Sequence, residues 1–262
     1  MKPKLSIVIT TYNRPNFLLR LIKFFGSYKL PLQLIILDSS TPNFENTEIQ
    51  NLVKEFNIIL KKFSSDILYT EKIARGCEYI NTDYCVLCAD DDFLFPNSLF
   101  KCMEFLDTHS DYSSAHGLYF IHSSREETIR KGFHLSQLYQ SGSNDAKKSS
   151  DRINKYLNMG TPLFLNPLFY AVHRTHEFKF IWKNANNYVN DYLCEYFATS
   201  MSLILGKMKK LPILYSSKEP NTFKWQSYEI YKKSMSPEII SAISEKLGNT
   251  LSKYEDISSS KA

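Results

Sequence analysis

The chain has 262 residues, of which 43% are hydrophobic and 23% are charged, as is usual for a globular protein with a substantial core. A formal net charge of +5, carried by evenly spread basic residues, argues against a nucleic-acid-binding protein. No apolar stretch approaches the roughly 18 residues that span a bilayer, and the apolar run near the amino terminus is too short for a signal peptide. We therefore expect a cytoplasmic protein without a transmembrane segment, and the odd number of cysteines favours reduced thiols.

The first part of the chain alternates between predicted strands and predicted helices. Apolar runs indicate buried strands, and apolar residues three and four positions apart indicate amphipathic helices. The expected order is strand 5–10, helix 15–25, strand 32–38, helix 49–56, strand 58–63, helix 71–81 and strand 84–89. Four strand-forming runs in about 90 residues predict an α/β fold with right-handed crossovers, in which helices cover both faces of a mostly parallel, Rossmann-like sheet.

The second part has a weaker pattern. A helix is predicted to start from a cap at Asn97, and the later elements are expected at 118–122 (strand), 151–157 (helix), 168–174 (strand), 190–205 (helix) and 237–247 (helix). The segment 142–150 is polar and aperiodic, which favours a mobile surface loop. The polar segment 216–225 is long enough to form a lid over a diphosphate, with Lys218 or Lys224 supplying positive charge.

Three successive carboxylates, Asp90, Asp91 and Asp92, follow the fourth predicted strand directly. Adjacent carboxylates repel one another, and this repulsion favours a bound cation among them. In an extended segment, side-chain alternation would turn Asp90 and Asp92 to one side, so that these two share the ion. Ligands that are all oxygen suit Mg²⁺ or Mn²⁺. On these residues alone, a solvated acidic turn remains the alternative.

Polar residues also follow the other predicted parallel strands, at Thr11–Asn13 and at Asp38–Ser39. Ligands of such sheets bind beyond the carboxyl ends of the strands, so we expect these residues and the three acids to border one crevice. The chain has neither G-x-G-x-x-G nor G-x-x-x-x-G-K-S/T, which excludes a dinucleotide fingerprint and a P-loop.

Three motifs together resemble a known family: Ser6-Ile-Val-Ile-Thr-Thr-Tyr-Asn-Arg-Pro15, the strand that ends in Asp38-Ser39, and Asp83-Tyr-Cys-Val-Leu-Cys-Ala-Asp-Asp-Asp92. In order and spacing they are similar to the nucleotide-sugar half of family-2-like glycosyltransferases with the GT-A fold, of the bacterial surface-glycan type. The resemblance implies a nucleotide-sugar-binding half at 1–110, an acceptor-binding and catalytic-base half of the same domain at 111–235, and a carboxyl-terminal helix and tail at 236–262.

The resemblance also implies roles for individual residues. The implied nucleotide contacts are Thr11, Tyr12, Arg14, Asp38, Ser39, Arg75, Asp90 and Asp91. Asp90 and Asp92 are the implied ligands of a Mn²⁺ or Mg²⁺ cofactor, and Lys72 is a weaker candidate than Arg75. One departure is Gly76, which stands where similar proteins have an asparagine.

A second group of polar residues lies at Asn190, Asp191 and Glu195. By residue type alone, Asn190 or Asp191 is most simply a helix cap. Similar enzymes carry an acidic pair at the start of a helix here, and its second member is the catalytic base. Only Asp191 matches that role, with Glu195, one helical turn later, as the second candidate.

The resemblance therefore implies a metal-dependent glycosyltransferase that moves a sugar from a nucleoside-diphosphate sugar, most commonly UDP-linked in similar proteins, to a hydroxyl of a glycan or lipid-linked glycan, with inversion. Two alternatives stay open: a nucleotidyltransferase, which would be expected to show a glycine-rich loop after the first strand, and a non-catalytic glycan-binding or scaffold protein. The sequence leaves open a peripheral association with the inner face of the membrane and a homo-oligomer.

Overall fold

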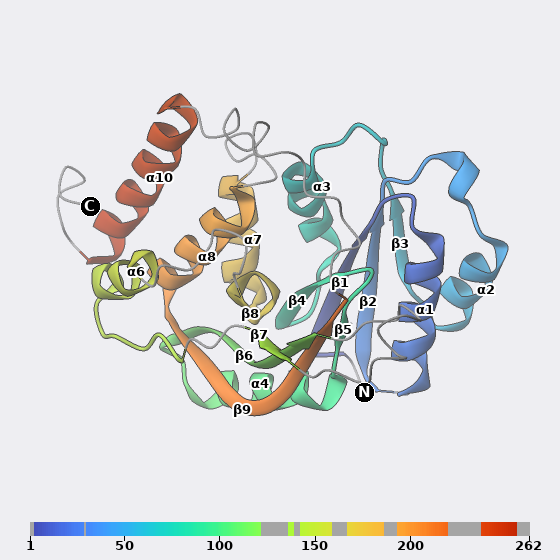
Figure 1. Cartoon of the computed structure of the whole chain (residues 1–262), viewed down its shortest axis with the longest axis horizontal. Coiled ribbons are helices and arrows are strands. Elements are labelled where there is room, and N and C mark those ends of the chain that lie inside the picture. The colour runs from blue at the N-terminus through green and yellow to red at the C-terminus, as the bar shows by residue number, and fades with distance from the viewer. Residues whose placement is uncertain are drawn as a thin grey trace.

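The computed structural model describes residues 3–28, 30–121, 136–138, 142–158, 167–185, 193–219 and 237–255. Its strands are β1 (Leu5–Thr11), β2 (Leu32–Asp38), β3 (Ile59–Lys62), β4 (Tyr84–Ala89), β5 (Phe93–Leu94), β6 (Tyr112–Ile121), β7 (Ser136–Leu138), β8 (Val172–Arg174) and β9 (Lys207–Lys218). They form one curled sheet in the order β3-β2-β1-β4-β8-β6-β9-β5, and β7 pairs with β6 (Figure 1).

The helices of the described residues are α1 (Pro15–Ser27), α2 (Thr47–Glu55), α3 (Tyr69–Gly76), α4 (Pro96–Thr108), α6 (Ser149–Leu157), α7 (Thr175–Ala185), α8 (Cys194–Leu205) and α10 (Pro237–Glu255). Short 3₁₀ turns lie at η1 (Pro42–Phe44), η2 (Cys77–Tyr79) and η3 (Pro167–Tyr170). Within the described ranges, none of the helices is both long enough and apolar enough to cross a bilayer.

The first four strands confirm the predicted parallel sheet. β1 lies between β2 and β4, and β3 pairs with β2, all in parallel. In this register Thr11 lies opposite Asp38, and Thr10 lies opposite Ala89. The residues that follow β1, β2 and β4 therefore emerge at one edge of the sheet.

The two faces of this sheet carry separate cores, because side chains alternate along each strand. On β1, Ile7 and Ile9 pack with apolar residues of α1, α2 and α4. Val8 packs on the opposite face with residues of α3, α7 and α8. Helices therefore cover both faces, as the sequence predicts, and Figure 1 shows α1 and α2 on the side away from α3 and α7.

The remaining strands make the sheet mixed. β8 is antiparallel to β4 and to β6, whereas β9 runs parallel to β6 and antiparallel to β5. The sequence did not predict β9, because its lysine-rich start and Pro212 break the apolar pattern. The strand predicted at 168–174 is wrong in its first half, which is the 3₁₀ turn η3, since a short apolar run does not distinguish a strand from a buried turn.

Several element ends also differ from the prediction. The fourth predicted helix starts at Pro96 with Phe95 as its N-cap, so Asn97 does not cap it. The helix expected at 71–81 is shorter and earlier: α3 is followed by the turn η2. Within the loop expected at 142–150, Asn144 is buried and pairs with Met208 of β9, which anchors that part of the loop.

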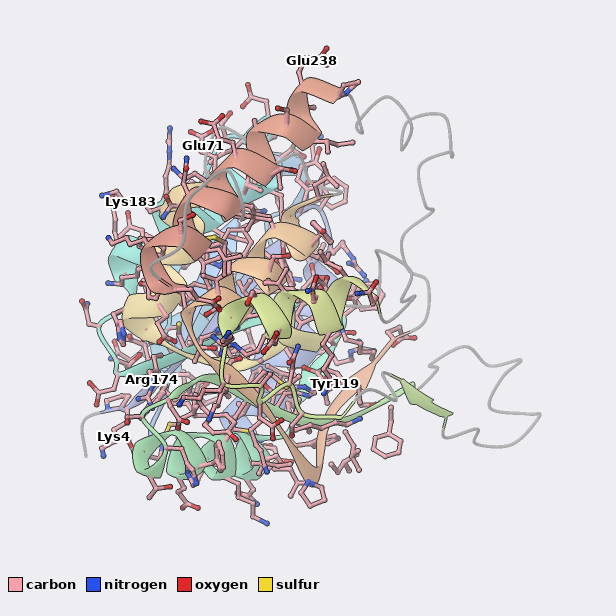
Figure 2. The ribbon with its side chains drawn as sticks, turned by 90° about the vertical axis from the view of Figure 1, so that its left-hand side faces the viewer. Lys4, Glu71, Tyr119, Arg174, Lys183 and Glu238 are labelled. Carbon is pink, nitrogen blue, oxygen red and sulfur yellow. The ribbon has the colours of Figure 1, made fainter. Side chains whose placement is uncertain are left out.

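The carboxyl-terminal helix α10 is longer than predicted and packs on the body of the protein. It contacts α6 and α8, and Figure 2 shows it lying alongside them. Ile243 and Leu251 of α10 are buried in the core that also contains α8. Packing is therefore the observed role of this helix in the described chain.

Candidate active site

Asp90, Asp91 and Asp92 form a turn directly after β4, which we call the acid turn. The backbone N–H of Asp92 donates to the carbonyl oxygen of Ala89 at 3.3 Å, so the chain turns here instead of staying extended. The three residues are only 3%, 9% and 7% exposed. The alternative prediction of a solvent-exposed acidic turn is therefore wrong. The side-chain alternation expected of an extended segment does not describe these residues either.

Arg14, in the loop after β1, binds the first two acids together. Its guanidinium lies 2.9 Å from Asp90 Oδ1 and 2.6 Å from Asp91 Oδ2. The hydroxyl of Thr11 donates to the other oxygen of Asp90 at 2.7 Å. The end of β1 and the end of β4 are therefore joined by a buried polar network, and the predicted convergence of these residues at one edge of the sheet is seen in it.

Asp92 faces the end of β9 instead. Lys218 Nζ lies 2.7 Å from Asp92 Oδ2, and the backbone N–H of Glu219 donates to Asp92 Oδ1 at 3.2 Å. Arg20 of α1 joins the same group, because it donates to the carbonyl oxygen of Asp91 at 2.9 Å and pairs with Glu219 at 3.0 Å. Sequence reasoning missed Arg20, and a single arginine beside an apolar helix stripe carries no signal that would have found it.

Burial dominates the electrostatics of this turn. It raises the pKa of Asp90 to about 6, although the charge of Arg14 and the hydrogen bond from Thr11 act in the opposite direction. Burial likewise raises the pKa of Asp92 in spite of Lys218. Two buried carboxylates that are reluctant to ionise provide an oxygen donor set that a hard divalent cation would stabilise.

Asp90 and Asp92 thus fit a divalent ion chemically, with a restriction on the ligand count. Within the described ranges, no three His, Cys, Asp or Glu side chains are grouped so that they alone hold a metal. Mg²⁺ commonly takes only one or two protein carboxylates and completes its shell with substrate phosphates and water. The donor set suits an ion that arrives with a phosphate-bearing ligand.

The end of β2 carries a second ion pair. Lys62 Nζ lies 2.7 Å from Asp38 Oδ2, and the backbone N–H of Ser40 donates to Asp38 Oδ1 at 2.8 Å. Burial alone would raise the pKa of Asp38, but the hydrogen bonds from Lys62 and Ser40 outweigh it, and the pKa lies below its ordinary value. Asp38 is therefore ionised at neutral pH.

A pocket lies beside Asp38, between the strand ends and the helices α1 and α2. Its walls include the polar residues Thr11, Asp38, Ser40 and Lys62 and the apolar residues Leu18 and Leu60. The pocket adjoins the Arg14 network through Thr11, which belongs to both. A ligand at this edge of the sheet could therefore contact both the pocket walls and the three acids after β4.

Asn13 fixes the loops after β1 and β2 to each other. Its φ angle is +54°, a left-handed conformation that asparagine tolerates better than most residues. Its backbone N–H donates to Ser40 Oγ at 2.8 Å, and its Oδ1 accepts from the backbone N–H of Thr41 at 2.9 Å. The neighbouring Tyr12 is 47% exposed and so is accessible to a ligand.

Lys72, and not Arg75, is the α3 side chain that reaches the strand ends. The buried Lys72 Nζ donates to the carbonyl oxygen of Thr11 at 3.2 Å and to Ser39 Oγ at 2.9 Å. Arg75 is exposed and pairs with Glu71 on its own helix. From the sequence we favoured Arg75 over Lys72. Residue type does not show which of the two faces the sheet, because the rotation of a short helix about its axis is determined by packing.

Asn190 and Asp191 lie outside the described residues. In the described residues α8 begins at Cys194, directly after Leu193, and the prediction that Asn190 or Asp191 caps this helix stays a prediction. Glu195 lies in the first turn of α8. Burial raises the pKa of Glu195 to about 7, and its carboxyl also interacts with the charges of Lys218 and Asp92, which links this helix start to the acid turn.

Comparison with known proteins places this arrangement in a family. Residues 6–164, more than half of the chain, match the family described as "Glycosyl transferase family 2". This match favours a glycosyltransferase over the nucleotidyltransferase and scaffold alternatives.

Solved structures of S. aureus TarS have the same fold. The structure of TarS 1–349 superposes with a TM-score of 0.62 at 14% identity, over 100% of this chain and 68% of that one. A longer TarS structure gives 0.61 at 14% identity and covers 100% of this chain and 41% of that one. The structure of TarS 1–349 in complex with UDP-GlcNAc gives 0.59 at 16% identity, over 100% and 69% of the two chains. Because the family match covers residues 6–164 and the fold is that of TarS, the chain belongs to glycosyl transferase family 2 and is a glycosyltransferase with a GT-A-like fold.

Proposed function

We propose that this glycosyltransferase takes its sugar from a nucleoside-diphosphate sugar that binds across the ends of β1, β2 and β4. The observation that carries the proposal is the meeting of Thr11, Asp38 and the acid turn at one edge of the sheet, beside a pocket. A UDP-linked donor is favoured because the similar protein TarS has structures in complex with UDP-GlcNAc and with UDP.

The described contacts suggest how such a donor would be divided over the site. The base and ribose would lie at the end of β2 beside Asp38, and Tyr12 and Ser39, which adjoin the pocket residues Thr11 and Ser40 in the chain, are proposed as further contacts. The ionised Asp38 would accept hydrogen bonds from N–H or hydroxyl groups of the nucleoside. Arg14, which bridges Asp90 and Asp91, would orient the diphosphate near the acid turn. In this scheme residues 1–110 bind the donor and residues 111–235 bind the acceptor.

Asp90 and Asp92 would hold a Mn²⁺ or Mg²⁺ ion at the diphosphate. Such an ion, when bound, offsets the negative charge that develops on the leaving group. Burial of the acid turn excludes water and so strengthens every charge interaction made there. The polar network of Thr11 and Arg14 holds Asp90 in a fixed orientation.

For the acceptor, Asp191 is proposed as the base that removes the proton from an attacking hydroxyl of a glycan or lipid-linked glycan, with in-line displacement and inversion. The family resemblance supports this assignment. Glu195 is the second candidate, because a pKa of about 7 suits a general base at neutral pH and its carboxyl lies within electrostatic reach of Asp92.

A thermal-shift panel tests the donor site directly. The protein is melted with UDP, GDP, CDP or dTDP, each with Mn²⁺, with Mg²⁺ or with EDTA. We expect stabilisation by UDP that requires the divalent ion and disappears in Asp92→Ala, together with loss of donor turnover. The matched control is Asp111→Ala, because Asp111 is an exposed acid that pairs with Lys207 far from the site. Full transfer activity in excess EDTA would refute the metal role. An unchanged melting temperature with all four nucleotides would refute the donor site.

A further inference from the structure

We propose that the ammonium group of Lys218 pairs with Asp92 in the donor-free protein. It leaves Asp92 when a divalent ion and a nucleoside diphosphate bind together. The inference rests on the proposed donor site and adds a residue that couples the two ligands. Its consequence is that metal and nucleotide bind cooperatively, and that the charge of Lys218 sets the size of this effect.

The contacts of Lys218 place its charge inside the acid turn. Its Nζ lies 2.7 Å from Asp92 Oδ2, with the two side chains only 14% and 9% exposed. The same nitrogen lies 3.6 Å from the centre of the Tyr170 ring. Removing one partner of a largely buried ion pair leaves an uncompensated charge, so a metal that uses this oxygen of Asp92 must compete with the ammonium for it.

The rest of the β9 end is held independently of this ion pair. Ser216 and Ser217 pair with β5, directly after the acid turn. The backbone N–H of Glu219 donates to the other oxygen of Asp92, and the Glu219 side chain pairs with Arg20. Asp92 therefore keeps these contacts when Lys218 moves, and exchange of the cation leaves the pairing of β9 with β5 in place.

The charges in direct contact explain why exchange needs both ligands. The three carboxylates of the turn meet two cationic side chains, Arg14 and Lys218, which leaves one net negative charge. A divalent ion alone would reverse that sign with the ammonium still beside it. A diphosphate brings at least two negative charges, neutralises the excess and gives Lys218 a new partner.

Tyr170 keeps the displaced ammonium nearby. A cation over the face of an aromatic ring is attracted to it without any anionic partner. Lys218 can thus leave Asp92 and turn to a phosphate oxygen while its nitrogen stays over the ring. Coupling between two linked ligands is reciprocal, so the nucleotide must tighten metal binding by the factor by which the metal tightens nucleotide binding.

The test measures Mn²⁺ binding by electron paramagnetic resonance, with and without UDP, and does not depend on turnover. In the wild type we expect weak binding of Mn²⁺ alone and binding tightened by a factor of about 5 to 150 when UDP is present. Lys218→Met removes the charge but keeps the length of the side chain, so Mn²⁺ alone should bind about tenfold more tightly and the effect of UDP should shrink. Lys218→Arg keeps the charge and should behave like the wild type.

The matched control is Lys207→Met, at the opposite end of β9, where Lys207 also pairs with an aspartate at 2.7 Å but at an exposed position. It should bind Mn²⁺ and UDP as the wild type does. Unchanged or weaker Mn²⁺ binding in Lys218→Met, with normal coupling, would refute the role of Lys218 and leave the donor site intact. Absence of any UDP binding to the wild type would instead refute the proposed donor site, and this inference with it.

Discussion

Replacing Asp90 with asparagine should stabilise the donor-free protein while it destroys the donor site. The carboxylate of Asp90 is 3% exposed, and burial raises its pKa to about 6 against an ordinary value of 3.8. Ionised Asp90 is therefore a source of instability, which the protein tolerates at the place where we propose that a cation binds. Asparagine has the same shape, can still accept from Arg14 and can donate to the hydroxyl of Thr11.

The size of the effect follows from the pKa shift. A shift of about two units at roughly 1.4 kcal/mol each corresponds to about 3 kcal/mol of free energy of unfolding. For a chain of this size, that difference would raise the melting temperature by roughly 6 to 12 °C. Because the folded state binds the Asp90 proton more tightly than the unfolded state, the advantage of Asp90→Asn should be complete above about pH 6 and vanish near pH 4.

The assay is thermal unfolding of the wild type and Asp90→Asn in EDTA, from pH 8 down to pH 4.5. Asp38→Asn provides the contrast, because the pKa of Asp38 is lowered and its ionised form stabilises the fold. That variant should be less stable than the wild type, with a deficit that is constant over this range and is lost only below about pH 4. If Asp90→Asn is less stable at pH 8, or if its advantage does not depend on pH, the reasoning about its burial is wrong.

Three further predictions concern the neighbouring residues. Lys72→Met should weaken UDP binding about tenfold in calorimetry and more than Arg75→Met does, because Lys72, unlike Arg75, donates to the ends of β1 and β2. An equal loss in both variants would contradict this reasoning. Arg152→Met should lower the free energy of unfolding, measured in urea, by at least about 3 kcal/mol. The reason is that the buried guanidinium of Arg152 donates to the carbonyls of residues 203 and 204 at the end of α8. A loss under about 1 kcal/mol would show that those carbonyls find other donors. Asp191→Asn should keep UDP affinity but reduce transfer about 10² to 10⁴-fold; a larger loss of transfer in Glu195→Gln would assign the base to Glu195.

The local parts of the fold were predictable because they depend on nearby residues. β2 and β4 have the predicted bounds, and β1 extends one residue further, since unbroken apolar runs and the turn residues after them define buried strands. The acids at the ends of β2 and β4 were located in the same way. By contrast, β9 was missed, because its pairing with β6 and β5 depends on segments that are far away in the sequence.

The sequence by itself determined which strands form the first half of the sheet and which chemical groups stand at their ends, because hydrophobic periodicity and turn chemistry act over a few residues. Only the tertiary structure decided how the charges pair. Thr11 and Asp90 are 79 positions apart, and Lys218 and Asp92 are 126 positions apart. A buried carboxylate needs a partner that offsets its charge, and the packing of distant elements determines which cationic side chain lies next to it.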